Sequence, residues 1–170
     1  MGGSLGAKTI NKAILDGLAQ LIHAGYQVVW QTGKNFIKQA DAAIKALNTN
    51  QVKAFDFIYA MDLAYAASDV VVSRAGALSV SELCLVGKPA ILIPFPAATE
   101  DHQTKNAMSL VKQNAAILVQ DADAAARLVN ELLMLLKDEL RQDILIQNIK
   151  KMGKPNAAMD IAMEVLSMKR

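Results

Sequence analysis

The stretch Asp69-Val70-Val71-Val72-Ser73 leads into Arg74-Ala75-Gly76, and a helical pattern follows over residues 79–86. A continuous β-branched run of this kind is typical of a strand that is covered on both faces, as in parallel sheets. A second apolar strand is predicted over residues 90–94, after the helix stops at Gly87. Strand, helix and strand in this order form a right-handed crossover, which places the segment in an α/β fold.

The same alternation extends through the rest of the chain. Helical periods are predicted over residues 8–24, 35–47 and 102–114 and from Ala122 onward, with an interruption near 153–155, and strands over 26–31, 52–55 and 116–119. These elements predict a Rossmann-like, doubly wound parallel sheet. We expect one domain over residues 1–170, in which residues 150–170 form a helical tail.

Composition limits the classes of function. The chain has 170 residues, of which 53% are hydrophobic and 20% charged, enough to bury a core. A net charge of +2 and 5% aromatic residues argue against nucleic-acid binding. Cys84 is the only cysteine, and neither a membrane-spanning run nor a signal-peptide pattern is visible. A reducing, cytoplasmic setting fits these features.

A glycine-rich segment, Gly2-Gly3-Ser4-Leu5-Gly6-Ala7, precedes the first predicted helix. Glycines let the backbone approach an anion, and the free amides of a helix start point toward it, so a phosphate or diphosphate is the natural ligand. A tight turn without a ligand is the plainer interpretation. A loop of this type normally follows a buried strand, and none is visible before Gly2, so we expect the chain to be cut from a longer protein.

Three other motifs fit this region less well. Gly2 to Gly6 match G-x-S-x-G, in which Ser4 would be a nucleophile and His102 its base, but the strand of such an elbow is not visible. A dinucleotide fingerprint requires an acid after the second strand, where the chain has Gln31-Thr32-Gly33. A P-loop requires an upstream glycine, which Gly33-Lys34 lacks.

The second candidate site follows the valine-rich strand and reads Ser73-Arg74-Ala75-Gly76-Ala77-Leu78-Ser79-Val80-Ser81-Glu82. Ser79 and Glu82 have the spacing of a capping box, in which Glu82 would only cap its own helix. Alternatively, the Glu82 carboxylate points into a cleft and accepts both hydroxyl hydrogens of a ribose diol. The role of Arg74 is open in the same way, because its guanidinium can neutralise a diphosphate or form a structural ion pair.

The third candidate site follows the strand over residues 90–94 and includes Asp101-His102-Gln103-Thr104-Lys105-Asn106-Ala107. Gln103 offers a donor and an acceptor, which suits sugar hydroxyls. The plainer interpretation makes Asp101 a helix N-cap and the other residues a solvated face. His102 has no second histidine at metal-ligand spacing, so no metal site is expected.

Together, these three segments resemble one family. Their order and approximate spacing are similar to those in the C-terminal domain of the MurG family, the bacterial lipid II-forming N-acetylglucosaminyltransferases, and three motifs in one order are more specific than any alone. The similarity covers roughly residues 2–119 with recognisable motifs, and the tail only in pattern. It implies the GT-B fold, in which two Rossmann-like lobes face a cleft, and this chain resembles the donor lobe.

The resemblance implies a binding site for UDP-N-acetylglucosamine. It implies that the phosphates lie near Gly3, Ser4, Leu5 and Gly6, and that the backbone of Ile58 faces the uracil edge. It also implies that the nucleotide and sugar are lined by Ala77, Leu78, Ser79, Val80, Ser81 and Glu82, with Glu82 on the ribose. The sugar hydroxyls would be contacted by Gln103, with His102 beside it. Leu5 stands where some members carry a polar residue, and His102 replaces a glutamine of some members. A direct side-chain contact at Leu5 is therefore lost, and the role of His102 is open.

The implied reaction is inverting transfer, in which a hydroxyl of lipid I attacks the anomeric carbon of the donor and UDP leaves, giving lipid II for peptidoglycan synthesis. The catalytic base is unassigned, and the acceptor and membrane-docking residues would belong to an N-terminal lobe. We therefore expect this hexosyltransferase fragment alone to be inactive. No metal or other cofactor is expected, and the enzyme would act peripherally at the cytoplasmic face of the bacterial cell membrane, in cell wall growth, shape and division.

Two alternatives remain open at this stage. The chain can be the donor lobe of another GT-B enzyme, such as a UDP-sugar epimerase or a two-subunit glycosyltransferase. It can also be a non-catalytic nucleotide-binding module. The Asp101–Ala107 segment favours the lipid II-forming family over the epimerase.

Overall fold

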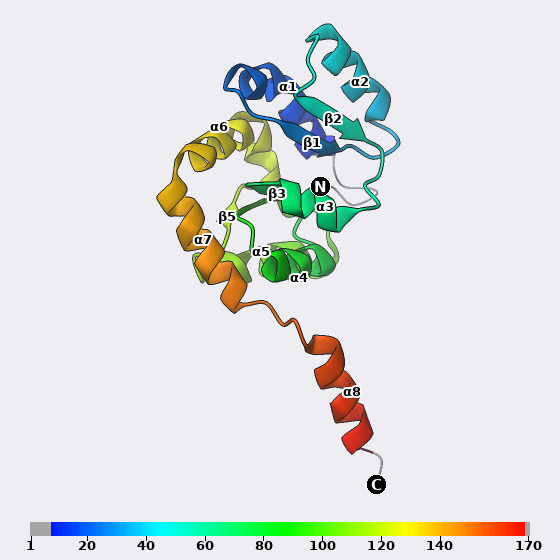
Figure 1. Ribbon diagram of the computed structural model, residues 1–170, viewed down its shortest axis with the longest axis vertical. Coiled ribbons are helices and arrows are strands. Elements are labelled where there is room, and N and C mark those ends of the chain that lie inside the picture. Colours follow the sequence, from blue (N-terminus) through cyan, green and yellow to red (C-terminus); the bar gives the residue numbers. More distant parts are fainter. Residues whose placement is uncertain (1–7, 169–170) are drawn as a thin grey trace.

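The computed structural model describes residues 8–168 and shows an α/β architecture (Figure 1). Its strands are β1 (Val28–Gln31), β2 (Val52–Phe55), β3 (Val71–Ser73), β4 (Ala90–Leu92) and β5 (Ile117–Leu118). Its helices are α1 (Lys8–His23), α2 (Ile37–Ala46), α3 (Met61–Ala67), α4 (Ala77–Val86), α5 (His102–Val111), α6 (Ala124–Lys137), α7 (Glu139–Lys151) and α8 (Ala157–Ser167), with 3-10 turns η1 (Thr99–Asp101) and η2 (Asp121–Asp123).

Every pair of neighbouring strands runs parallel, as the alternating pattern predicted. The described strands form two sheets, one of order β1-β2 and one of order β3-β4-β5. Val28 lies opposite Val52 in the first sheet, and Val71 lies opposite Ala90 in the second. The predicted α/β fold with parallel strands is therefore confirmed, and within residues 8–168 the strands belong to two sheets with β1 and β3 at their edges.

Two apolar cores hold the layers together. The first joins α1 and α6 to the strands and includes Leu18, Leu21, Ile91, Ile93 and Leu128, all of them buried. The second lies under α4, α5 and α7, where residues such as Leu83, Leu92, Leu110 and Ile149 are fully covered. β4 is buried at every position and is shared by both cores, because side chains of successive residues point to opposite faces of a strand.

Several element boundaries differ from the predictions. α3 was not predicted, because a helix of seven residues is too short for a helical period to stand out. α4 begins at Ala77 rather than Ser79, and its last turn ends on Gly87, whose φ of 64° is the left-handed conformation of a glycine C-cap. The predicted helical tail is divided by breaks at Asp138 and at residues 152–156.

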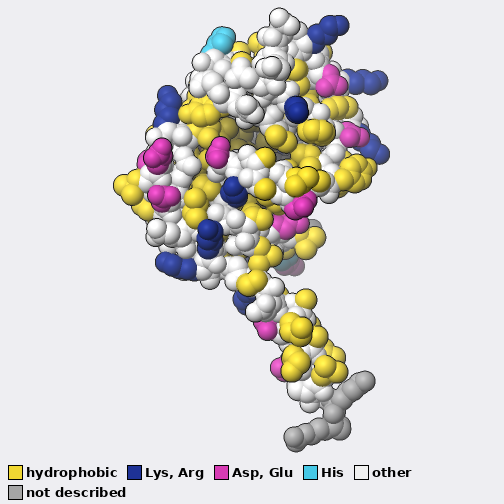
Figure 2. All heavy atoms as spheres, in the orientation of Figure 1, with side chains coloured by type: hydrophobic (Ala, Val, Ile, Leu, Met, Phe, Trp, Pro, Cys, Tyr) yellow, Lys and Arg dark blue, Asp and Glu magenta, His cyan; other side chains and the backbone are white. Residues whose placement is uncertain are grey.

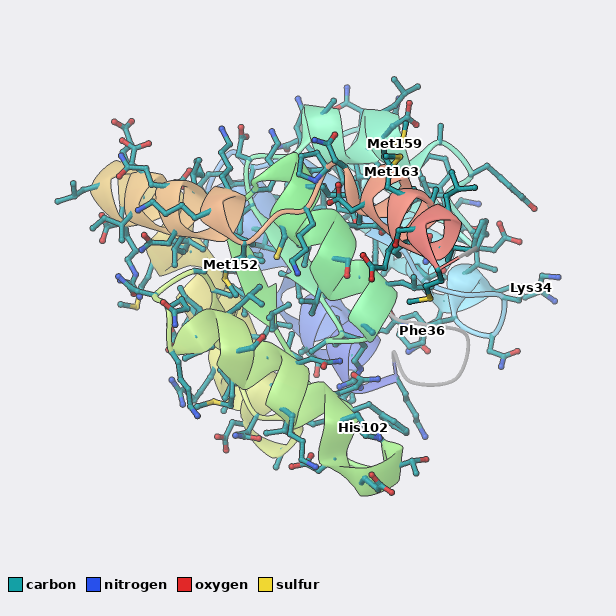
Figure 3. All side chains as sticks on the ribbon, turned by 90° about the horizontal axis from the view of Figure 1, so that it is seen from below. Lys34, Phe36, His102, Met152, Met159 and Met163 are labelled. Atoms are coloured by element: carbon teal, nitrogen blue, oxygen red, sulfur yellow. The ribbon has the colours of Figure 1, made fainter. Side chains whose placement is uncertain are left out.

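The last helix, α8, stands away from the rest of the molecule on the segment that follows α7 (Figure 1). None of its residues is buried, and Figure 3 shows Met159 and Met163 on it, apart from Met152 at the end of α7. Over the described part of the chain, no helix combines the length and the apolar character needed to cross a membrane.

Candidate functional site

The loops that follow β3, β4 and β5 meet at one edge of the three-stranded sheet. The strands are parallel, so their carboxyl ends lie on the same side, which is where open α/β sheets bind ligands. These loops carry two of the three sequence segments predicted as sites, Ser73–Glu82 and Asp101–Ala107. The structure therefore brings these two segments together.

An ion pair between the buried Arg74 and the half-buried Asp121 connects this edge from side to side. Arg74, which follows β3, places Nη1 2.5 Å from Oδ1 of Asp121, which lies after β5. The same Nη1 donates to the carbonyl oxygens of Ile93 and Pro94, and the guanidinium lies 5.5 Å from the Phe95 ring. With 5% of its surface exposed, Arg74 is a structural ion-pair residue, the second of the two roles predicted for it.

Gln103 at the start of α5 fastens two of the loops to each other. Its Oε1 accepts hydrogen bonds from the backbone N–H of Phe95 at 3.0 Å and of Ala75 at 3.3 Å. One turn later, the Asn106 Nδ2 donates to the Ala75 carbonyl at 3.0 Å. The Gln103 oxygen is thus occupied by the protein itself. Within the described residues its Nε2 donates no hydrogen bond and remains for a ligand.

Glu82 is held by a residue that the sequence did not reveal. The Tyr65 hydroxyl on α3 donates to Oε2 of Glu82 at 2.9 Å. Burial, the hydrogen bond and the negative charge of Glu82 together raise the pKa of Tyr65, with burial the largest cause. The predicted capping box is wrong, because Gly76 is the N-cap of α4, no side chain caps this helix, and Ser79 lies within its first turn. Glu82 is exposed and so is available to a ligand.

The first turn of α4 presents an open face at the carboxyl edge. Ala77, Leu78 and Ser81 are exposed beside Glu82, and Leu78 has 82% of its surface accessible. Ser79 and Val80 are half-buried, and Val80 packs against the core under α4. The first N–H groups of a helix have no intrahelical partner, so this uncapped start favours an anion.

The backbone position predicted for the uracil edge has a partner within the chain. The Ile58 N–H donates to Oε1 of Gln31, at the end of β1, at 3.0 Å. A base that uses this N–H must replace the glutamine oxygen. Gln31 was not predicted as a site residue, although its place at a strand's carboxyl end is the position at which such residues are expected.

His102 projects from the start of α5 (Figure 3), where its side chain is 60% exposed. Its Nε2 lies 3.5 Å from Oε2 of Glu100. Asp101 is the N-cap residue of α5, as the plainer interpretation predicted, although its side chain makes no capping hydrogen bond. Glu100 and Asp101 have φ values of 50° and 57°, a left-handed pair that turns the chain into α5. No group of His, Cys, Asp or Glu side chains in residues 8–168 is arranged to hold a metal ion.

The remaining predictions concern other parts of the molecule. Gly3, Ser4, Leu5 and Gly6 lie outside the described residues.

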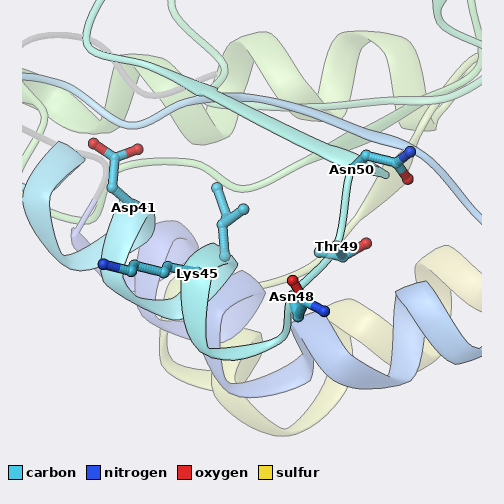
Figure 4. Close-up of a pocket in the computed structure, with 6 residues that line it drawn as sticks. Asp41, Lys45, Asn48, Thr49 and Asn50 are labelled. Carbon is cyan, nitrogen blue, oxygen red and sulfur yellow. The ribbon is translucent and has the colours of Figure 1, made fainter.

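A pocket of about 550 Å³ lies at the C-terminal end of α2, lined by Asp41, Ile44, Lys45, Asn48, Thr49 and Asn50 (Figure 4). The loop that lines it leads into β2, at the amino end of that strand, so this pocket is on the opposite edge from the predicted site.

The Tyr65 phenol should make stability depend on pH. Because its pKa is raised in the folded chain, the unfolded chain releases the proton first, and stability is lost as pH rises above about 10. Tyr65→Phe removes this titration. The free energy of unfolding of the wild type, measured in urea, should therefore fall relative to that of the variant as pH rises above about 10. Tyr59→Phe is the control, since this side chain is 90% exposed. A constant difference between wild type and Tyr65→Phe across this pH range would contradict the buried phenol.

Comparisons with known proteins agree with this arrangement. The chain matches the family model for the glycosyltransferase family 28 C-terminal domain over residues 1–164. It is 48% identical over 167 residues to a UDP-N-acetylglucosamine–N-acetylmuramyl-(pentapeptide) pyrophosphoryl-undecaprenol N-acetylglucosamine transferase of Porphyromonas gingivalis, covering 97% of this chain. A protein of the same name from Cytophaga hutchinsonii is 48% identical over 168 residues and covers 99%. The chain spans 44% of the length of each of these relatives.

Solved structures give the same picture of the fold. The crystal structure of Acinetobacter baumannii MurG superposes with a TM-score of 0.83 at 29% identity, over 99% of this chain and 51% of that one. A UDP-N-acetylglucosamine 2-epimerase superposes with a TM-score of 0.63 at 20% identity, over 93% of this chain and 40% of that one. The second likeness is one of fold alone.

Proposed function

Because the chain belongs to glycosyltransferase family 28 through its C-terminal domain, we propose that it is the donor-binding lobe of an enzyme that transfers N-acetylglucosamine from UDP-N-acetylglucosamine to lipid I, giving lipid II. The observation that carries the proposal is the carboxyl edge of the sheet. There, the open start of α4, with Glu82 held by Tyr65, lies beside the β4–α5 loop that Gln103 fastens.

Each part of the site has a role in the proposed complex. Glu82 receives the ribose hydroxyls, and the uncapped amides of α4 face the diphosphate. Ala77, Leu78 and Ser81 line the nucleotide from the same exposed face. Ser79 and Val80, being half-buried, support that face, and the proposed site requires no metal or other cofactor.

The reaction in this proposal is a single displacement. An acceptor hydroxyl of lipid I forms a bond to the anomeric carbon while the bond from that carbon to the UDP oxygen breaks, and the acceptor proton passes to a base outside this chain. Negative charge develops on the departing diphosphate. Helix amides directed at that charge stabilise it in the transition state.

The partners of the whole enzyme form part of the same proposal. The relatives are more than twice as long as the part that this chain matches, which leaves room for an acceptor lobe with the catalytic base and the lipid-binding surface. Lipid I carries its sugar on an undecaprenyl pyrophosphate, so the enzyme would work peripherally at the cytoplasmic face of the bacterial cell membrane.

Ligand titration tests the proposal directly. The purified chain should bind UDP and UDP-N-acetylglucosamine, and it should bind UDP-glucose more weakly than the latter, because the acetamido group adds a contact. Titration calorimetry with the three ligands, and with ADP as the control for the base, measures this order. Equal affinity for UDP and ADP would show that no uracil-reading site is present.

Gln103 offers a second test, in which structure and binding can be separated. Gln103→Ala should lower the free energy of unfolding by about 1–2 kcal/mol, because two backbone N–H groups lose their acceptor. It should also weaken UDP-N-acetylglucosamine binding by about 0.5–1.5 kcal/mol more than UDP binding, through loss of the Nε2 donor.

Gln103→Glu is the matched control: it keeps an acceptor oxygen, removes the amide donor and adds a negative charge, which should weaken binding of UDP and of UDP-N-acetylglucosamine alike, so the ratio of the two affinities is the quantity compared. Its stability should stay near that of wild type in thermal unfolding, while its preference for UDP-N-acetylglucosamine over UDP falls as in Gln103→Ala. If both variants keep the wild-type preference for UDP-N-acetylglucosamine over UDP, Gln103 does not contact the sugar and only holds the two loops together.

A further inference from the structure

The side chain of Gln31 ties the loop that carries Ile58 to the sheet. This loop, named here the β2–α3 loop, covers residues 56–60 between the end of β2 and the start of α3. Its Ile58 N–H donates to Oε1 of Gln31, the last residue of β1, at 3.0 Å. Among residues 8–168, no other hydrogen bond joins this loop to β1, because the Phe57 N–H bonds to the neighbouring Asp56 side chain. The position of the Ile58 amide therefore depends on Gln31.

The Gln31 amide group is only partly engaged. Its oxygen accepts the Ile58 N–H, whereas its Nε2 donates to no group within the described residues. Gln31 is half-buried at the carboxyl end of β1, so water can reach this nitrogen. A single neutral hydrogen bond adds little net stability in water, so a ligand with a suitable acceptor can displace the side chain.

The carboxamide of Gln31 has the same chemistry as the edge of a uracil ring. Both present a carbonyl oxygen next to an N–H group, and the oxygen is an acceptor that suits a backbone N–H. A uracil carbonyl at the Ile58 N–H would therefore exchange one hydrogen bond for another of the same kind. Glutamine and base compete for one donor, because a single N–H cannot serve both with good geometry.

The surface of the β2–α3 loop suits a base once Gln31 has moved. Phe57 and Tyr59, on either side of Ile58 in the sequence, are 51% and 90% exposed, and their ring centroids lie 4.9 Å apart. Figure 2 shows hydrophobic side chains gathered in the upper right of the molecule, where this loop runs between β2 and α3. Apolar surface beside a polar N–H matches a planar base, which has apolar faces and a polar edge.

We propose that Gln31 sets the affinity of the site for the donor nucleotide by competing with uracil for the Ile58 N–H. The inference rests on the proposed function and adds to it a residue that acts before the base is bound. Uracil binds only to the state in which Gln31 is released. The observed dissociation constant is therefore the intrinsic one divided by the population of that state. A side chain that cannot bond to Ile58 removes this cost.

Gln31→Met tests the competition, because methionine keeps the length of the side chain and has no strong acceptor. UDP and UDP-N-acetylglucosamine should each bind about three- to tenfold more tightly to this variant than to wild type in calorimetric titration. Pyrophosphate, which carries no base, should bind both proteins equally. Gln27→Met is the matched control, since it makes the same exchange at an exposed residue just before β1 and should leave all three affinities unchanged.

Gln31→Glu should change the affinity in the other direction. A carboxylate holds the Ile58 N–H more strongly than an amide oxygen does, so the ratio of UDP affinity to pyrophosphate affinity should fall at least about threefold. The ratio is compared because the added charge repels both diphosphates. An unchanged or weaker UDP affinity in Gln31→Met would overturn the competition, because Gln31 would then be a bystander or a direct contact of the base.

Amide hydrogen exchange in the free chain separates this inference from the proposed function. The Ile58 amide should exchange at least about threefold faster in Gln31→Met than in wild type or in Gln27→Met. Equal exchange would refute the Gln31 contact even if the wild-type chain prefers UDP to ADP. Faster exchange in a chain that lacks this preference would remove the proposed function, and the competition with it, while the contact itself would stand.

Discussion

Asp121→Ala is expected to lower the free energy of unfolding by about 3–5 kcal/mol, the cost of leaving one partner of a buried ion pair without its counter-charge. Arg74 is almost completely buried, and its guanidinium joins the loop after β3 to Asp121 and to the loop after β4. Without the carboxylate, the charge of Arg74 stays in the protein and the Thr9 hydroxyl loses its acceptor. Urea unfolding followed by circular dichroism measures the loss.

Asp123→Ala is the matched control in the same 3-10 turn. Asp123 pairs with Arg127 at 4.0 Å on an exposed surface, so its removal should change stability by no more than about 0.5 kcal/mol. Replacing both members of the buried pair, as Arg74→Met with Asp121→Leu, should recover much of the loss, because apolar side chains of similar size leave no charge unpaired. If Asp121→Ala is as mild as Asp123→Ala, the pair is not the support described above.

Glu82→Ala is expected to weaken UDP binding by about 1.5–3 kcal/mol, the range for hydrogen bonds that involve a charged group. The Glu82 carboxylate is exposed, and Tyr65 engages only its Oε2, so lone pairs remain for both ribose hydroxyls. Calorimetric titration with UDP and with 2′-deoxy-UDP measures the contact. The wild-type chain should prefer UDP, and Glu82→Ala should bind the two ligands equally.

Tyr65→Phe separates the carboxylate from the residue that positions it. This variant keeps the charge of Glu82 and removes only its hydrogen bond, so the loss of UDP affinity should be smaller than in Glu82→Ala, about 0.5–1.5 kcal/mol. A wild-type chain that binds UDP and 2′-deoxy-UDP with the same affinity would exclude the ribose contact. Glu82 would then be only the acceptor for a buried phenol.

The parallel architecture could be predicted because the relevant signals are local. The valines that form β3, the apolar run of β4 and the helical period of α1 each lie within one element, and parallel strands follow from their alternation. The division into two sheets could not be predicted in this way. It depends on which strands lie side by side, which no single segment encodes.

The candidate site was predictable in its position but not in its internal contacts. The rule that ligands bind at the carboxyl ends of strands placed Glu82 and Gln103 correctly at one edge. Their partners are distant in sequence: Tyr65 is 17 positions from Glu82, and Asp121 is 47 positions from Arg74. The capping-box spacing misled because Gly76, with no side chain to offer, begins the helix before Ser79 is reached.

Trp30 is a spectroscopic probe of a cavity of about 460 Å³ that lies between β1 and β3. It is the only tryptophan of the chain, lies on β1 with 5% of its surface exposed, and lines that cavity. Its indole Nε1 donates to Asn11 on α1 at 3.0 Å, and its ring lies 5.8 Å from that of Phe36. All indole fluorescence from this protein therefore originates at the junction of the two sheets. Its emission wavelength and its access to quenchers report on that junction without any attached dye.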